Sequence, residues 1–292
     1  MTTFRAAVLQ MRSGREPADN AAALDALVGE AVAGGAHYVQ SPEMTGMLQR
    51  DRGALMDRLR TEDDDLLVAT ASELARRHGI HLHLGSIAVA LEDGRVANRA
   101  LLFAPDGQRV ARYDKIHMFD VDLDNGESWR ESRTYRPGGA AVLADLAFTD
   151  GTARLGFAIC YDMRFPHLFR EEALAGAEIL TAPAAFTRQT GEAHWHVLLR
   201  ARAIENGAFV IAAAQGGRHE DGRETYGHSL IVDPWGAVIA EVEGNEPGVA
   251  FADIDTAAVA AARGKVPNLK NARNFTVGDA EVAVTGAREA AE

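Results

Sequence analysis

The stretch RLGFAICYDMRFP, residues 154–166, decides how the rest of the chain is interpreted. Its first seven residues have the apolar character of a buried strand, and the sequence then continues through a turn into a helical pattern. Cys160 therefore stands at a strand end and before a helix, where a substrate and backbone N–H groups can approach it. A lone free cysteine is more often a small buried hydrophobic residue. The context alone leaves a nucleophile and a structural thiol open.

Strands and helices alternate on both sides of this stretch. The apolar patterns and the Gly and Pro residues between them predict strands at 4–10, 37–40, 81–90, 96–103, 109–113, 152–159, 179–182, 209–213, 229–232, 238–242 and 249–254, and helices at 18–33, 61–78, 168–175, 191–206 and 256–263. Turn signals between the middle strands argue against a purely parallel sheet. No linker interrupts the pattern, so we expect one α/β domain, residues 1–275, with helices covering strand layers and a C-terminal tail, residues 276–292.

Composition excludes several classes of function. The 292 residues are 47% hydrophobic, which is ordinary for a globular protein, and 30 Lys and Arg against 42 Asp and Glu give a net charge of −12. Such a charge argues against nucleic-acid and anionic-membrane partners. No apolar run is long enough for a membrane span, and the N-terminus does not resemble a signal peptide, so we expect a cytoplasmic protein. A single cysteine excludes an intramolecular disulfide and a multi-cysteine metal site.

Motifs for phosphate, dinucleotide and zinc-protease chemistry are absent. Four acidic residues are spaced much as in a calcium loop: Asp120, Asp122, Asp124 and Glu131. Asn125 stands where that loop needs Gly, so a solvated acidic loop is the better interpretation. His81 and His83 share a strand face near His78, but no carboxylate is close in sequence, and we expect them at the surface or the core edge. We therefore expect no metal and no organic cofactor.

Two charged residues occupy positions comparable with that of Cys160. Glu43 follows the predicted strand at 37–40, and Lys115 follows the strand at 109–113. Each alone has the appearance of a solvent-facing charge, but open α/β sheets place ligand sites at strand carboxyl ends. If the three strands are neighbours, the residues form a reaction centre, because a thiol needs a base and an ammonium group can stabilise an oxyanion.

The chain resembles the nitrilase, or carbon–nitrogen hydrolase, superfamily over roughly residues 4–275. Three motifs carry the resemblance in the family's order: SPEMTG at 41–46, YDKIHMFDVD at 113–122 and GFAICYDMRFP at 156–166. Further agreement extends through PAAFTRQTGEAHWHVLLRARAIEN, YGHSLIVDPWG and VPNLKNAR. The resemblance implies a four-layer α-β-β-α sandwich, homodimers or multiples of them, and a catalytic triad of Glu43, Lys115 and Cys160. It also implies a supporting role for Glu131, in RESRTYRPGG.

The resemblance implies amide hydrolysis through a thioester on Cys160, with release of ammonia. Glu43 acts as the base, and Lys115 with a backbone N–H, that of Tyr161, binds the oxyanion. Phe186, Thr187 and Arg188 follow a strand and are candidates for the pocket wall. Arg164 and Arg188 are candidates for binding a substrate carboxylate, although Arg164 could equally form a structural ion pair. His194, Trp195 and His196 lie on a predicted helix, where we expect them to pack.

The motifs around Lys115 and Cys160 resemble the Nit branch, whose members act on deaminated glutathione or, as omega-amidases, on 2-oxoglutaramate. The segment 200–236 is closer to the enzymes for deaminated glutathione, which implies a small carboxylate-bearing amide as the substrate. The loop at 122–132 departs from the family pattern and leaves the substrate open. Nitrile hydrolysis and carbamoyl-group removal remain enzymatic alternatives. A binding or scaffold protein is the non-enzymatic one, and the complete triad argues against it.

Overall fold

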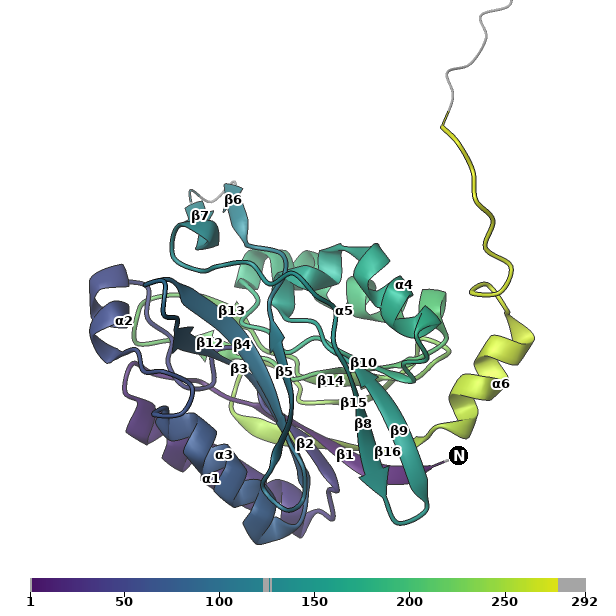
Figure 1. Cartoon of the computed structure of the whole chain (residues 1–292), viewed down its shortest axis with the longest axis horizontal. Coiled ribbons are helices and arrows are strands. Elements are labelled where there is room, and N and C mark those ends of the chain that lie inside the picture. Colours follow the sequence, from purple (N-terminus) through teal and green to yellow (C-terminus); the bar gives the residue numbers. More distant parts are fainter. Residues whose placement is uncertain (1, 123–125, 127, 278–292) are drawn as a thin grey trace, which may run out of the picture.

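The computed structural model describes residues 2–122, 126 and 128–277. Two six-stranded sheets stack face to face and carry helices on their outer faces (Figure 1). This arrangement confirms the predicted α-β-β-α sandwich. Most of the expected tail at 276–292 lies outside the described residues, as does Asp124 of the acidic loop.

The first sheet has the order β16-β1-β2-β3-β4-β5. Its strands are β1 (Thr3–Gln10), β2 (Tyr38–Gln40), β3 (His81–Ala90), β4 (Val96–Phe103), β5 (Arg109–Asp114) and β16 (Gly248–Asp255). The strand β2 runs parallel to β1 and β3, whereas the β3–β4–β5 meander is antiparallel, as the turn signals predicted. The carboxyl ends of β2 and β5 lead directly to Glu43 and Lys115.

The second sheet has the order β15-β14-β11-β10-β9-β8. Its strands are β8 (Leu143–Phe148), β9 (Gly151–Gly156), β10 (Ile179–Thr181), β11 (Phe209–Ala212), β14 (Leu230–Val232) and β15 (Val238–Glu241). The strands β9, β10 and β11 are parallel, so their carboxyl ends lie at one edge of the sheet. Cys160 follows β9 at that edge.

Helices cover the outer faces, with α1 and α3 against the first sheet and α4 and α5 against the second (Figure 1). The helices are α1 (Pro17–Ala33), α2 (Arg52–Arg58), α3 (Leu66–His78), α4 (Pro166–Leu174), α5 (Arg188–Asn206) and α6 (Ala257–Lys265). Short elements complete the described chain: β6 (Asp120–Asp122), β7 (Ser128–Arg130), β12 (Gly216–Arg218), β13 (Glu224–Tyr226) and the 3-10 turns η1 (Glu131–Arg133) and η2 (Cys160–Arg164). None of the helices in the described ranges has the length and apolar character needed to cross a bilayer.

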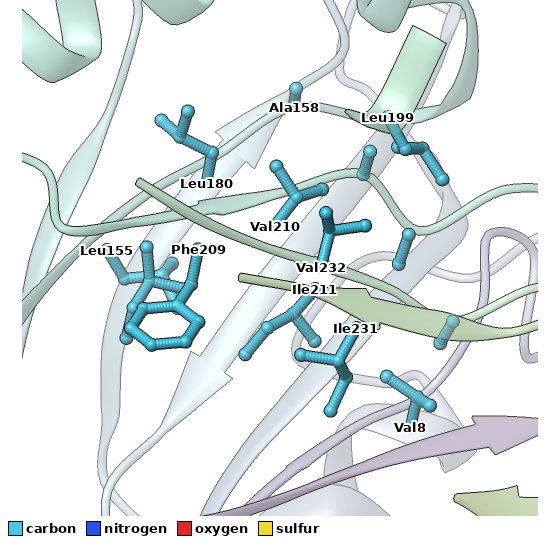
Figure 2. Packing of buried hydrophobic residues seen from close by; sticks show 14 of the residues in the cluster. Val8, Leu155, Ala158, Leu180, Leu199, Phe209, Val210, Ile211, Ile231 and Val232 are labelled. Carbon is cyan, nitrogen blue, oxygen red and sulfur yellow. The ribbon is translucent and has the colours of Figure 1, made fainter. Parts of the chain in front are cut away.

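Residue alternation along the strands builds the layers. Phe4 and Val8 of β1 belong to the core between the sheets, whereas Leu9 belongs to the core beneath α1 and α3. Figure 2 shows Val8 close to Ile211 and Ile231 of the second sheet. This apolar contact fixes the two sheets relative to one another, and with them the strand ends that carry the polar residues.

The structure differs from the sequence prediction mainly at element ends. The helix predicted at 61–78 begins at Leu66, because the Asp65 carboxylate caps it by accepting hydrogen bonds from the N–H groups of Leu67 and Val68. The strand predicted at 152–159 ends at Gly156. The sequence prediction missed α2, β8 and the short hairpins β6–β7 and β12–β13, whose segments are too short or too polar for a clear pattern.

Candidate active site

Glu43 lies in the loop after β2 with 5% of its surface exposed. Its Oε1 accepts hydrogen bonds from Asn98 Nδ2 (2.9 Å) and Lys115 Nζ (3.0 Å), and its Oε2 accepts one from the N–H of Ala185 (2.8 Å). The carboxylate is thereby fixed from both sheets, since Asn98 belongs to β4 and Ala185 follows β10. A buried charge with this many partners is held in one orientation.

Lys115 is the first residue after β5, and its side chain is buried. Its Nζ donates to Glu43 and to both carboxylate oxygens of Glu131, at 3.0 and 2.9 Å. The backbone holds the residue in place, because its N–H donates to the carbonyl of Asn98 and its carbonyl accepts from the N–H of Gly138. One ammonium group therefore bridges two carboxylates inside the protein.

Glu131 opens the turn η1 and completes this cluster. In addition to Lys115, its carboxylate accepts hydrogen bonds from the N–H of Phe119 (2.7 Å) and from Asn98 Nδ2 (3.2 Å). Asn98 thus donates to both glutamates, and it is fully buried in β4. The sequence analysis missed Asn98, although a polar residue within the apolar strand VANRALLF was a detectable signal.

Cys160 sits on a strained turn between β9 and α4. Its backbone has φ of +47°, a left-handed conformation that is uncommon outside glycine, and its N–H donates to the carbonyl of Pro183 (2.9 Å). The thiol and the Glu43 carboxylate influence one another's pKa, which places them side by side in the cluster. The turn thus directs the sulfur at the base that the sequence predicted for it.

Asp162, two residues further on, fastens the cysteine turn to the lysine segment. Its fully buried carboxylate accepts hydrogen bonds from the N–H of Ile159 (2.9 Å), the hydroxyl of Tyr113 (2.7 Å), and both the N–H (3.0 Å) and Nδ1 (2.7 Å) of His117. Tyr113 and His117 flank Lys115 in sequence. One buried carboxylate therefore fixes the spacing of the two segments, a role that the sequence analysis did not detect.

The three central groups set one another's charge. Burial raises the pKa of Glu43, but the positive charge and hydrogen bond of Lys115 outweigh it, so the pKa lies below its ordinary value. Burial lowers the pKa of Lys115, but Glu131 and Glu43 outweigh it and raise that pKa well above its ordinary value. Burial and the Glu43 charge raise the pKa of the Cys160 thiol, which Lys115 opposes. At neutral pH the site therefore contains a carboxylate, an ammonium group and an uncharged thiol.

A cavity of about 290 Å³ opens onto this cluster. Glu43, Lys115, Glu131, Cys160 and Tyr161 all line it, and so do Phe186 and Thr187. The structure therefore brings together every residue that the sequence analysis expected at the site, except for the two arginines.

Arg164 and Arg188 do not line the cavity. The guanidinium group of Arg164 contacts His194 Nδ1 at 3.3 Å and lies over the ring of Phe186, whereas Arg188 pairs with Glu192 and Glu224 at the surface. Their places near strand ends were predicted correctly, but their side chains point elsewhere. The cavity instead has arginines that sequence analysis missed: Arg50, Arg52, Arg130 and Arg223. They lie on loops, a short helix and a short strand, which left no pattern to find them by.

The three helix side chains that were expected to pack, those of residues 194–196, have different surroundings. Trp195 is fully buried, and its Nε1 donates to the carbonyl of His228 (2.8 Å), so it packs as expected, whereas His194 is exposed. His196 contacts Glu241, and its ligand atom lies within 4.8 Å of those of His228 and Glu241, a grouping that could hold a metal ion. These three side chains are not among those lining the cavity. His81 and His83 are buried in β3.

Known proteins of one family share this architecture. The carbon–nitrogen hydrolase family model matches residues 5–264. The deaminated glutathione amidase of Synechocystis is 39% identical over 278 residues, which cover 93% of this chain and 98% of that protein. The crystal structure of the C. elegans NitFhit protein superposes with a TM-score of 0.84 at 35% identity, covering 93% of this chain and 65% of that one.

A structure of the amidase from Nesterenkonia sp. AN1 superposes with a TM-score of 0.76 at 25% identity, covering 92% of this chain and 94% of that one. It is a variant that shows covalent addition of the acetamide moiety of fluoroacetamide at the active-site cysteine. The matches cover both sheets, their helices and the loops that carry the buried cluster. The chain belongs to the carbon–nitrogen hydrolase family.

Proposed function

We propose that this protein is an amidase that cleaves the C–N bond of a small amide through a thioester on Cys160. The observation that carries the proposal is the cluster of Glu43, Lys115 and Cys160 at the wall of one cavity, with the Lys115 ammonium group hydrogen-bonded to the Glu43 carboxylate. The cluster thus combines a nucleophile, a base and a cation, which are the groups that acyl transfer through a covalent intermediate requires.

In the first half-reaction the Cys160 sulfur attacks the amide carbonyl while the thiol proton passes to Glu43. The ammonium group of Lys115 and the backbone N–H of Tyr161 bind the oxyanion. Glu43 then gives its proton to the departing nitrogen, the C–N bond breaks, and a thioester remains. The raised pKa of the thiol means that proton transfer accompanies the attack, since little thiolate exists beforehand.

In the second half-reaction a water molecule attacks the thioester. Glu43 takes a proton from this water, which Glu131 helps to position, and returns it to the sulfur as the C–S bond breaks. Both glutamates contact the same lysine, so the base and the water-positioning group stay fixed through the cycle. The scheme uses side chains and backbone alone.

The nucleophile is tested by the substitution Cys160→Ala. It should abolish turnover, and it should leave the fold intact because the change is small. Mass spectrometry of native enzyme quenched during turnover should find the acyl group on the peptide that contains Cys160. An active Cys160→Ala protein would reject the mechanism.

The substrate that we propose is deaminated glutathione, the substrate in the name of the Synechocystis relative. It carries carboxylates, and its scissile nitrogen belongs to a dipeptide, so an amine leaves rather than the ammonia expected from the sequence. 2-Oxoglutaramate would release ammonia, and both substrates yield 2-oxoglutarate. One assay for 2-oxoglutarate therefore ranks both by kcat/KM, and a preference for 2-oxoglutaramate would move the assignment to omega-amidase.

We further propose that two copies associate through the outer face of the second sheet. Large hydrophobic side chains are exposed on its helices: Leu174 on α4, and Val197 and Ile204 on α5, each more than half exposed. Exposed apolar side chains on two contacting helices favour a protein partner, and a second copy agrees with the homodimer that the family resemblance implies. Light scattering that returns about 31 kDa at micromolar concentration would reject this assembly. The cytoplasmic location stays a prediction.

A further inference from the structure

The wall of the cavity is more positive than the protein as a whole. Among the described residues that line it, five are cationic and three are carboxylates, although the full chain has a net charge of −12. The carboxylates of Glu43 and Glu131 are paired with Lys115 within the buried cluster. The remaining positive charge of the lining comes from the four arginines, and Glu224 is the remaining lining carboxylate. Outside the lining, Asp122 pairs with Arg130 and Asp221 with Arg223. A local excess of this kind attracts an anionic ligand.

Two of the four arginines are less suited to binding a ligand, one because it is hydrogen-bonded within the protein and one because it is exposed. Arg130 donates to the Asp122 carboxylate and to the backbone carbonyls of Val121 and Trp129. Arg52 is exposed on the short helix α2. Arg223 and Arg50 have a different arrangement.

Arg223 and Arg50 both face the indole ring of Trp129, which itself lines the cavity. Their guanidinium carbons lie 5.1 and 5.0 Å from the centre of that ring. An aromatic face orients a guanidinium group without using its N–H donors. Trp129 therefore positions both guanidinium groups and leaves N–H donors of each available to a ligand.

Arg223 is the better anchored of the two. Its side chain is 18% exposed, and its Nε donates to Asp221 (2.8 Å), a carboxylate that is itself 1% exposed. Within the part of the chain that the structure describes, neither the terminal nitrogens of Arg223 nor the Arg50 guanidinium group forms a hydrogen bond or an ion pair. The Arg223 charge also reaches the inner wall, since it opposes the rise that burial causes in the pKa of Tyr135.

We propose that Arg223 and Arg50, held against Trp129, form a subsite that binds the carboxylate of the substrate's acyl part while the amide reaches Cys160. This assignment rests on the proposed amidase function and names the groups that select its substrate. A planar guanidinium with free terminal donors matches a carboxylate in a two-point contact. Partial burial of Arg223 strengthens that contact, because water competes less.

The test compares 2-oxoglutaramate with its methyl ester, which has nearly the same shape and no negative charge. The native enzyme should prefer the acid. In Arg223→Gln, kcat/KM for the acid should fall about 10- to 100-fold, mainly through KM, as expected for one charged hydrogen-bonded contact, while the ester is unaffected. Arg50→Gln should show a smaller loss of the same kind.

Two further variants control for charge and for folding. Arg223→Lys keeps the charge and should retain part of the preference for the acid. Arg76→Gln removes an exposed arginine on α3, paired with Glu73, and should retain all of it. An unchanged acid-to-ester ratio in both Arg223→Gln and Arg50→Gln, or no preference in the native enzyme, would overturn the subsite.

A second measurement does not depend on turnover. 2-Oxopentanoate, which carries one carboxylate, should slow the alkylation of Cys160 by iodoacetamide at pH 9 in the native protein, whereas its methyl ester should not, and this protection should be lost in Arg223→Gln. If neither amide is hydrolysed, the proposed function fails while protection still decides the subsite. Equal protection in native and Arg223→Gln protein, or none in either, would refute it.

Discussion

Lys115→Met removes the cation on which two buried carboxylates depend. Lys115 Nζ donates three hydrogen bonds, to Glu43 and to both oxygens of Glu131, and the side chain is 2% exposed. Methionine has a similar length but neither charge nor donors. Breaking a buried ion pair by removing one partner costs about 3–5 kcal/mol. We expect a loss of that size at pH 7, and a kcat at least about 10²-fold lower because the oxyanion loses a donor.

The pH dependence distinguishes this explanation from a simple packing defect. In the native protein the pKa of Glu43 is lowered, so its stabilising contribution exists above the unfolded pKa and disappears as the pH falls through the folded pKa. In Lys115→Met, burial and the neighbouring Glu131 raise the pKa of Glu43 instead. The folded variant then binds more protons than the unfolded chain, and its free energy of unfolding falls as the pH rises above about 4.3, the unfolded value for Glu. The stability gap should therefore widen from pH 5 to pH 7.

Urea denaturation at several pH values measures this gap directly. The double variant Lys115→Met/Glu131→Gln provides the matched control, because it also removes one of the two carboxylates that repel each other once Lys115 is gone. It should regain part of the lost stability at pH 7 without regaining kcat. A gap that does not change with pH, or a double variant no more stable than Lys115→Met, would refute the electrostatic reasoning.

Two other predictions follow from the same contacts. Glu43→Gln keeps the shape but removes the base, so kcat should fall at least about 10²-fold. In the native enzyme, kcat/KM should decline only below pH 4.5, because the pKa of Glu43 lies under that value. A decline that begins at higher pH would contradict the role of Glu43 as the base. Gly85→Ala would place a Cβ 2.0 Å from the carbonyl oxygen of Ser41 and 2.6 Å from that of Pro42. We expect the free energy of unfolding to fall by about 1–3 kcal/mol because of overpacking, and kcat to fall because Glu43 shifts. Urea denaturation and initial rates measure the two effects. Native values for both would show that the loop containing Ser41 and Pro42 moves aside without cost.

The sequence, together with the family resemblance, was sufficient to predict which residues form the candidate site. Glu43 and Cys160 each follow an apolar strand, whose end is visible as a change from apolar to polar residues. Lys115 follows β5, which is itself rich in charged residues. The three strands are not neighbours, however, since β3 and β4 lie between β2 and β5, and β9 belongs to the second sheet. Their ends meet because the two sheets stack face to face, which the strand pattern did not show. Glu131 was predicted only through the family resemblance, because it opens a short 3-10 turn with no pattern of its own.

The sequence was not sufficient to predict where side chains point. Arg164 and Arg188 stand near strand ends, yet one contacts His194 and the other Glu192 and Glu224. The left-handed backbone of Cys160 is another example, since a positive φ at a non-glycine residue results from the tertiary contacts around it. The direction of a side chain depends on contacts between segments that are far apart in the sequence.

The charges of the cavity also determine how an anionic substrate must enter. The inner cluster contains Glu43, Glu131 and Lys115 beside an uncharged Cys160 thiol, which leaves one negative charge in excess. A substrate carboxylate placed there would meet like charge in a water-poor environment, where repulsion is strong. The amide end, being neutral, meets no such barrier. The inner negative charge and the outer arginines therefore act together, and a carboxylate-bearing amide has one favourable orientation, with its amide at Cys160 and its charge at the proposed subsite.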